Sequence, residues 1–161
     1  MPSKSQRQTW LLKTEPETFS FEQMLKDHLK GKSTPWNGVR NFQARNFLKA
    51  MKRGDLAFIY HSGDDRAAVG MAEVVKEAYP DKTPMADKED ERKGDWVQVD
   101  LKPVLTFKTP VTLKDIKANP ALTDIKLIKQ SRLSCMPVSA EHQQELLKMS
   151  GLSLKEIQTW T

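Results

Sequence analysis

The sequence has a single cysteine, Cys135, so no disulfide can form within the chain. Structural disulfides belong to oxidising compartments, and their absence fits a cytoplasmic protein, nucleoid-associated in a bacterium or nuclear in a eukaryote. No stretch approaches the roughly 18 consecutive apolar residues that span a membrane, so we expect no membrane partner. Residues 1–8 are polar and lack the apolar core of a secretion signal, and we expect them to form a flexible tail.

Residues that commonly bind metals or act as nucleophiles are also scarce. The chain has three histidines, His28, His61 and His142, and none has metal-ligand spacing to another histidine or to Cys135. We therefore expect no metal site and no cofactor. Cys135 is interpreted as a small buried apolar residue, because a nucleophilic thiol would need a neighbouring base that the sequence does not reveal.

Acidic side chains offer little for catalysis. Asp64 and Asp65 are adjacent, but adjacent carboxylates on a polar loop are usually solvated. Glu15 stands next to Pro16 at a predicted strand end, where its side chain could turn inward. No carboxylate spacing indicates general acid–base chemistry, so we predict no catalytic residues and a non-enzymatic protein.

The 161 residues fit one compact domain, which we place at residues 9–161. Lysine and arginine number 26 against 21 aspartates and glutamates, which gives a formal charge of +5. This modest excess favours a polyanionic partner only if the cations gather on one surface. The chain shows no internal repeat, no glycine-rich phosphate loop and no regular alternation of strands with helices.

Apolar periodicity and turn residues predict a mixture of strands and helices. Strands are expected at residues 9–14, 54–60, 67–79, 96–107 and 133–138, the third bent at Gly70. Helices are expected from residue 20 to near Gly31, at 41–52, 112–118 and 139–149, and from residue 153 onward. Residues 36–40 are predicted to form a loop, and residues 80–95 a charged, solvated excursion. The pattern is α+β: a mixed sheet that curls or closes into a small barrel, with helices around it.

The segment Trp36-Asn37-Gly38-Val39-Arg40-Asn41 concentrates side chains that suit nucleic-acid recognition. An indole can stack on a base, an amide can bond a base edge, and a guanidinium can fork onto a phosphate. Glycine allows close backbone approach to a ligand. The alternative is structural: Trp36 in the core, Asn37-Gly38 as a turn and Asn41 as a helix cap. Residue chemistry alone favours this alternative.

Basic residues follow this segment. Arg45, Lys49 and Lys52 are spaced i, i+4 and i+7, so they share one helix face, and Arg40 and Arg53 bracket them. Such a face can track a phosphate backbone, although solvated helix faces also carry many cations.

A strand end supplies a third candidate. Tyr60-His61-Ser62-Gly63 lies where a predicted strand opens into a loop, and residues at such ends commonly line clefts. The alternative is an ordinary strand terminus.

Several motifs, taken in order, resemble the EVE domain family, part of the PUA-like superfamily and related to YTH and ASCH domains. The blocks that match are Trp10-Leu11-Leu12-Lys13-Thr14-Glu15-Pro16, residues 36–41, residues 43–48, Gly54-Asp55, residues 60–62, Val69-Gly70, residues 75–81 and Arg132-Leu133-Ser134. They cover nearly the whole chain and are specific together. The resemblance implies a PUA-like fold, a small mixed β-barrel flanked by helices.

The resemblance also implies a ligand. EVE domains are associated with recognising modified bases in DNA, such as methylated cytosine derivatives, or modified RNA, and YTH domains hold a methylated adenine in an aromatic cage. By motif order, Trp36 looks like a cage aromatic, and Lys13-Thr14 looks like the Lys-Ser strand end of the YTH relatives. The candidates for a second cage aromatic are Tyr60, Trp96 and Trp10.

We therefore predict a non-catalytic module that binds nucleic acid and reads a modified or flipped base in DNA or RNA. The residues expected at the base pocket are Trp36, Asn37, Val39, Arg40, Asn41, Tyr60, His61, Ser62, Lys13, Glu15 and Arg132. The expected contacts to the nucleic-acid backbone are Arg45, Lys49, Lys52 and Arg53. The alternatives are a nucleotide or small-molecule sensor or interaction module and, less favoured, a nucleic-acid-processing enzyme that uses Glu15, Asp64 or Asp65.

Overall fold

Six strands form one sheet in the computed structural model, which describes residues 7–84 and 95–160. The strands are β1 (Thr9–Thr14), β2 (Thr34–Trp36), β3 (Leu56–His61), β4 (Ala67–Pro80), β5 (Val97–Thr112) and β6 (Cys135–Val138). Their order across the sheet is β2-β5-β4-β3-β1-β6. β1 and β3 are parallel, and the other neighbouring pairs are antiparallel. The predicted mixed sheet is therefore confirmed.

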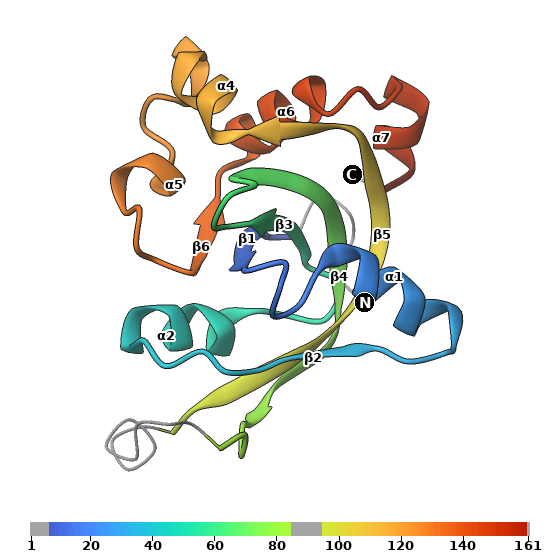
Figure 1. Cartoon of the computed structure of the whole chain (residues 1–161), viewed down its shortest axis with the longest axis vertical. Helices are drawn as coiled ribbons and strands as arrows, with labels where there is room; N and C mark the ends of the chain where they lie inside the picture. Colours follow the sequence, from blue (N-terminus) through green and yellow to red (C-terminus); the bar gives the residue numbers. More distant parts are fainter. Residues whose placement is uncertain (1–6, 85–94, 161) are drawn as a thin grey trace.

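The sheet curls because its two longest strands bend (Figure 1). The register between β4 and β5 shifts at four places, and such irregularities increase local bend and twist. Gly70, where we expected a bend, also lets helix α1 (Phe21–Leu29) approach closely. A Cβ at Gly70 would lie 2.5 Å from Cζ of Phe21 and 2.6 Å from the carbonyl oxygen of Leu105. Any larger residue would therefore push α1 away from the sheet.

The helices are α1, α2 (Phe42–Ala50), α4 (Leu113–Ala118), the 3-10 helix η2 (Pro120–Leu122), α5 (Lys126–Lys129), α6 (Ala140–Met149) and α7 (Leu154–Trp160). Three of the helices begin at side-chain caps that the sequence predicts, whereas η2 and α5 form where no helix was expected and α5 has no side-chain cap. Ser20 and Asn41 cap α1 and α2 through side-chain oxygens that accept backbone N–H bonds. At α7, Ser153 and Glu156 form both hydrogen bonds of a capping box.

Two strands differ from the prediction. The predicted loop at residues 36–40 is wrong at Trp36, because residues 34–36 form the edge strand β2, in which Trp36 pairs with Val99. Three residues around a central proline give no alternating pattern that sequence reasoning can detect. β5 also continues beyond residue 107 to Thr112, because its second half pairs with the start of β4.

Two predicted segments fall largely outside the described residues. Of the tail at residues 1–8, only Arg7 and Gln8 are described; of the excursion at residues 80–95, residues 85–94 are not. The backbone N–H of Gln8 donates to Oδ1 of Asp55 (3.1 Å), and Nη2 of Arg7 lies 3.4 Å from Oε2 of Glu73. The last two residues of the predicted tail are therefore attached to the sheet.

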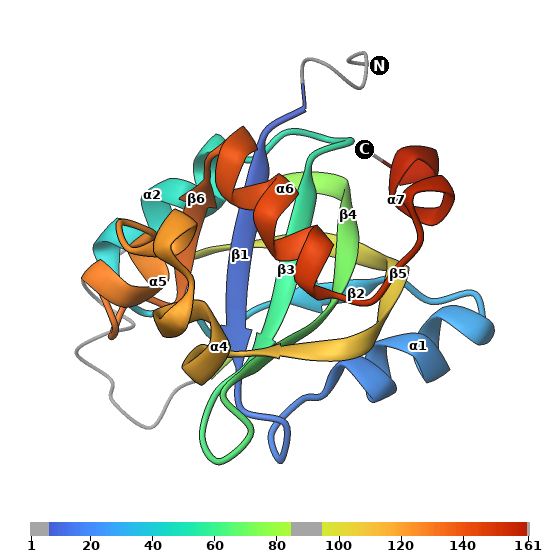
Figure 2. The ribbon, with the colours of Figure 1, turned by 90° about the horizontal axis from the view of Figure 1, so that it is seen from above.

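The core fills the inside of the curled sheet. Leu11 of β1, Phe58 of β3 and Met71 of β4 are fully buried there, and Cys135 is buried as predicted. In Figures 1 and 2, α4, α6 and α7 lie along one side of the sheet, while α1 and α2 lie on the other. In residues 7–84 and 95–160, no helix is long and apolar enough to cross a membrane.

Candidate nucleic-acid interface

A cleft of about 450 Å³ opens where β1 and β3 end. These strands are parallel neighbours, so their carboxyl ends lie side by side, with Lys13 beside Tyr60 and Thr14 beside His61. The remaining wall comes from the turn between β3 and β4, from α4 and α5, and from the connection to β6. We call it the strand-end cleft; its lining residues are Lys13, Thr14, Glu15, Tyr60, Ser62, Gly63, Arg66, Leu113, Leu127, Ser131, Arg132 and Ser134.

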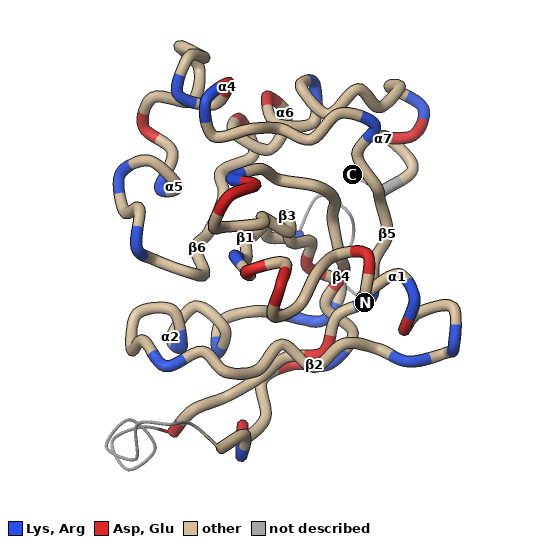
Figure 3. The backbone as a smooth tube through the Cα atoms, viewed as in Figure 1, with Lys and Arg blue, Asp and Glu red and all other residues tan. Residues whose placement is uncertain are grey.

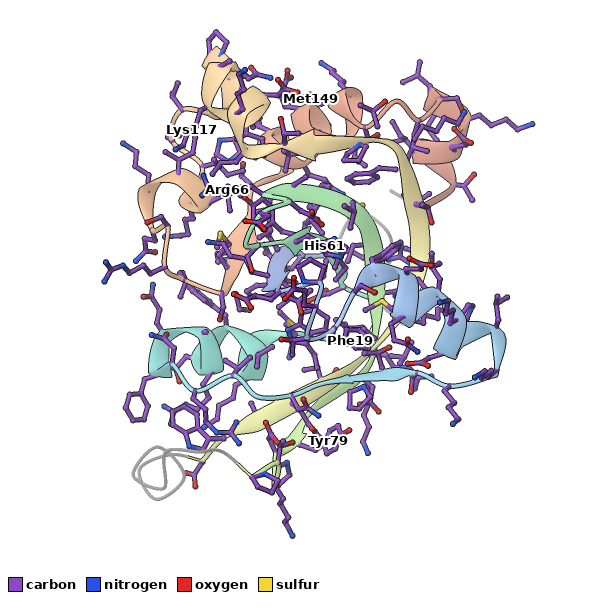
Figure 4. All side chains as sticks on the ribbon, viewed as in Figure 1. Phe19, His61, Arg66, Tyr79, Lys117 and Met149 are labelled. Atoms are coloured by element: carbon purple, nitrogen blue, oxygen red, sulfur yellow. The ribbon has the colours of Figure 1, made fainter. Side chains whose placement is uncertain are left out.

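The charges of the strand-end cleft favour an anionic ligand. Lys13, Arg66 and Arg132 line it, against the single carboxylate of Glu15. Nζ of Lys13 donates to the carbonyl oxygen of Ser131 (2.7 Å), which fixes the ammonium group in the cleft wall. Burial lowers the pKa of Lys13, because the charged form loses part of its hydration. Figure 4 shows Arg66 on the side of the sheet nearest α4 and α5, and Figure 3 shows further cations along α5.

Apolar groups and free hydroxyls supply the rest of the cleft wall. Tyr60 and Leu127 are buried at its base, and burial raises the pKa of Tyr60 although Arg66 nearby lowers it. Within the described part of the chain, the hydroxyls of Ser62, Ser131 and Ser134 make no hydrogen bond to the protein. Each hydroxyl can both donate and accept, so together they can bond the edge of a base.

A second hollow of about 380 Å³ adjoins the strand-end cleft and shares Ser131 and Arg132 with it. We call it the flanking hollow. It extends past Lys129 to Asn41 and Gln43 at the start of α2. Nε2 of Gln43 donates to Oε1 of Gln130 (3.2 Å), which joins α2 to the chain that follows α5. The two hollows therefore form one continuous surface that carries four cations, the three of the cleft and Lys129.

The segment 36–41 lies mostly away from the strand-end cleft. Trp36 is 6% exposed and packs edge-on against Phe19, with ring centroids 6.2 Å apart. Val39 is buried, and Asn37 lines a separate hollow of about 230 Å³ beside Trp36. Trp36 lines this separate hollow and not the strand-end cleft, so it cannot stack on a base held in the cleft. Asn41 caps α2 and reaches only the flanking hollow.

Arg40 holds the fold together. Its Nη1 lies 2.9 Å from Oδ2 of Asp81, and its Nη2 donates to the carbonyl oxygen of Thr83 (2.8 Å). Asp81 also accepts the backbone N–H bonds of Gly38 and Thr83, both at 2.8 Å. Burial alone would raise the pKa of Asp81, but the hydrogen bonds from Thr83, Arg40 and Gly38 hold it below the usual value. The guanidinium is thus engaged with Asp81 and is not available to a phosphate.

His61 has a positioning role at the start of α1. Its Nε2 accepts the backbone N–H of Phe21 (3.0 Å), so the ring proton lies on Nδ1, 3.3 Å from Oδ2 of Asp65. His61 is buried and does not line the strand-end cleft. Asp64 and Asp65 are exposed on the turn that follows.

The residues predicted to contact the nucleic-acid backbone lie in two separate places. Arg45 packs on Phe42, with Cζ 4.9 Å from the ring centroid, and Lys49 is exposed on the same helix. Lys52 and Arg53 precede β3, whose other end forms the strand-end cleft. At about 3.3 Å per residue, the length of β3 separates these two side chains from the cleft. The structure therefore does not bring Lys52 and Arg53 to it.

Sequence reasoning missed part of the strand-end cleft. Arg66, Leu113, Leu127 and Ser131 line it but belong to no motif that stood out, and Ser134 was matched only as part of the block Arg132-Leu133-Ser134. The available signal for this wall of the cleft was the cluster of cations Lys126, Lys129 and Arg132 in the sequence. In the described residues, no group of three His, Cys, Asp or Glu side chains could hold a metal ion. Burial raises the pKa of the Cys135 thiol, which keeps it protonated and unreactive.

The sequence profile of the EVE domain matches residues 8–149. The chain belongs to the EVE domain family. Thymocyte nuclear protein 1 of chicken is 38% identical over 157 residues, which cover 82% of this chain and 64% of that protein. The human protein of that name is 38% identical over 159 residues, covering 82% of this chain and 69% of its own length. This EVE chain therefore spans about two thirds of the length of these relatives.

Solved structures agree with this assignment. A crystal structure of a protein from Agrobacterium tumefaciens is 39% identical with a TM-score of 0.81, covering 91% of this chain and 95% of that one. The structure of human THYN1 protein in complex with DNA that contains 5-methylcytosine is 33% identical with a TM-score of 0.77, covering 91% and 99%. An ASCH protein from Zymomonas mobilis, at 13% identity and a TM-score of 0.55, covers 89% and 99% and shares the fold alone. The PUA-like α+β fold is thereby confirmed.

Proposed function

We propose that this EVE domain binds nucleic acid and holds one modified or flipped-out nucleobase in the strand-end cleft, without breaking a bond. The observation that carries the proposal is the composition of this cleft. Three cations, of which Lys13 and Arg66 are each held by a hydrogen bond to a backbone carbonyl, line the cleft together with the hydroxyls of three serines and the buried Tyr60 and Leu127. Its volume of about 450 Å³ falls within the range of ligand pockets. The human relative with 5-methylcytosine DNA supports the choice of ligand.

Each wall of the cleft has a distinct task in this proposal. Half-buried Leu113 contacts the apolar surface of the base above the buried Leu127 and Tyr60, while Ser62, Ser131 and Ser134 bond its edge. Arg66 and Arg132 at the rim bind the phosphates on either side. Lys13 adds positive charge from the wall. A flipped base costs a few kcal/mol to unstack, so a single strand should bind more tightly than a paired duplex.

The test is a binding titration with labelled oligonucleotides at one salt concentration. Single and double strands carry either cytosine or 5-methylcytosine at one position, and fluorescence anisotropy reports the affinity. We expect the modified single strand to bind most tightly, and the double variant Ser62→Ala with Ser134→Ala to lose that preference. The variant Lys52→Ala, which changes an exposed cation beyond the opposite end of β3 from the cleft, is the matched control.

Two rival functions predict different results in the same titration. A sensor of free nucleotides would bind 5-methylcytidine itself as tightly as the oligonucleotide, because the flanking phosphates would add nothing. A nucleic-acid-processing enzyme would shorten or deaminate the probe when divalent metal is added. Equal affinity for modified and unmodified strands, with no effect of the serine substitutions, would remove the strand-end cleft from base recognition.

A further inference from the structure

The first residue of α2 carries an exposed aromatic ring. Phe42 is 48% exposed and follows Asn41, which lines the flanking hollow. Leu29, Phe42 and Leu154 are the large apolar side chains exposed among the described residues, and Phe42 is the aromatic one of the three. An exposed phenylalanine loses hydrophobic stabilisation, and the flat ring offers a surface on which a base can stack.

The ring of Phe42 is held in place by a stack of its neighbours. It lies 5.1 Å from the ring of Trp96 at an interplanar angle of 27°. Cζ of Arg45 lies 4.9 Å from the Phe42 centroid and 5.9 Å from the Trp96 centroid. Oδ1 of Asn46 accepts hydrogen bonds from Nε and Nη2 of Arg45 at 3.2 and 3.0 Å, which orients the guanidinium. A ring fixed in this way loses little conformational entropy when a ligand stacks on it.

We propose that Phe42 and Arg45 form a second nucleotide subsite, in which a base flanking the one in the strand-end cleft stacks on the Phe42 ring. The strand would cross the flanking hollow between the two subsites, with its phosphates beside Arg132 and Lys129. Because the flanking hollow is continuous with the strand-end cleft, one strand can run through both hollows. This inference rests on the proposed function, and it specifies the path of the strand and a minimum ligand larger than one nucleotide.

The chemistry of the surface favours a nucleic-acid strand as its occupant. An aromatic face next to an arginine suits the alternation of flat bases and charged phosphates, and such stacking tolerates any base. The side chains of Asn41, Gln43 and Gln130 are polar and exposed or half-buried, so the hollow offers no apolar groove for a protein helix. The subsite therefore adds affinity without base preference, whereas the strand-end cleft supplies selectivity.

The experiment compares two probes that differ in reach. 5-Methyldeoxycytidine 5′-monophosphate can fill only the strand-end cleft, whereas a longer single strand with one 5-methylcytosine can also reach Phe42. Phe42→Leu removes the aromatic face and keeps apolar contact with Trp96, and Phe42→Tyr keeps the face. Lys52→Ala, beyond the opposite end of β3 from the cleft, is the control. We expect Phe42→Leu to weaken binding of the long strand roughly five- to hundredfold and to leave the mononucleotide unchanged. Phe42→Tyr should bind like the wild type.

A fluorescent base reports the stacking directly. With 2-aminopurine next to the modified base, binding to the wild-type protein should quench its fluorescence at one of the two flanking positions, and Phe42→Leu should abolish that quenching. The subsite is overturned if Phe42→Leu leaves the long strand's affinity and the quenching unchanged, or if it weakens both probes equally. The proposed function fails separately, if Ser62→Ala with Ser134→Ala leaves both affinities unchanged.

Discussion

Polar side chains of the segment 36–41 are bonded within the protein, whereas polar side chains of the strand-end cleft are open to a ligand. In the segment, Arg40 is paired with Asp81, the Asn41 side chain caps a helix, and Trp36 is buried. In the cleft, Ser62, Ser131 and Ser134 keep hydroxyls that bond nothing within the described chain. A polar group whose bonds are satisfied inside the protein stabilises the fold, and a group left unsatisfied around a hollow is available to a ligand. Residue type alone does not separate the two cases.

The most direct test of this difference between the two regions is to remove the side chain of Arg40. Arg40→Ala leaves Asp81 buried without its ionic partner, and breaking such a pair costs about 3–5 kcal/mol. We therefore expect a loss of that size in the free energy of unfolding, measured with urea. The loss should shrink in acid: Asp81 has a lowered pKa, so its stabilising charge is present at neutral pH and disappears as pH falls through that value. If the Arg40→Ala variant keeps its stability but no longer binds nucleic acid, Arg40 contacts the ligand and its structural role is contradicted.

Trp36→Ala tests the same segment through packing. The indole is 6% exposed and contacts Phe19, so truncation should leave a cavity and cost about 3 kcal/mol. Thermal unfolding followed by circular dichroism measures this loss. Near-native stability with lost base preference would contradict the buried role and restore Trp36 as the stacking residue.

Arg132→Ala should change binding and not folding. Arg132 is exposed and lines both hollows, so its removal leaves no buried group unpaired. A hydrogen bond to a charged group contributes about 1.5–3 kcal/mol, so we expect affinity for an oligonucleotide to fall roughly tenfold or more. The loss should be equal for modified and unmodified strands, with a shallower salt dependence. An unchanged salt slope would mean that Arg132 contacts no phosphate.

Lys13 should make binding sensitive to alkaline pH. Burial lowers its pKa, so its positive charge is present at neutral pH and is lost as pH rises through a value below that of an ordinary lysine. Affinity for the oligonucleotide should fall over that range by a few fold. Lys13→Arg, whose guanidinium stays protonated, should show a flatter pH profile, and identical profiles for the two proteins would exclude Lys13 from the effect.

The smallest change is expected at Lys52 and Arg53. They lie beyond the opposite end of β3 from the strand-end cleft, and charges separated by more than about 10 Å are largely screened at ordinary salt. The double alanine variant should therefore lower affinity by about twofold or less. A loss as large as that of Arg132→Ala would place the strand across the other end of the sheet.

The sequence was informative where local rules decide the structure. The caps Ser20, Asn41 and Ser153 and the strands β1, β3 and β4 follow from local spacing, so their positions could be predicted. The partner of Arg40 could not, because Asp81 is 41 residues away in a charged stretch and no local rule pairs them. The cleft likewise depends on the parallel pairing of β1 with β3, which brings Lys13 beside Tyr60 from distant segments. Family resemblance identified the fold, whereas the role that it implied for the segment 36–41 in base recognition stays a prediction.

A titration followed by amide chemical shifts compares the two regions in one measurement. The isotope-labelled protein is titrated with a single strand that contains one 5-methylcytosine. We predict the largest shifts at residues 13–15, 60–66 and 131–134, with smaller shifts at residues 42–45 and little change at residues 36–40. Shifts confined to residues 36–40, with the strand-end cleft unperturbed, would contradict the assignment of base recognition to the cleft.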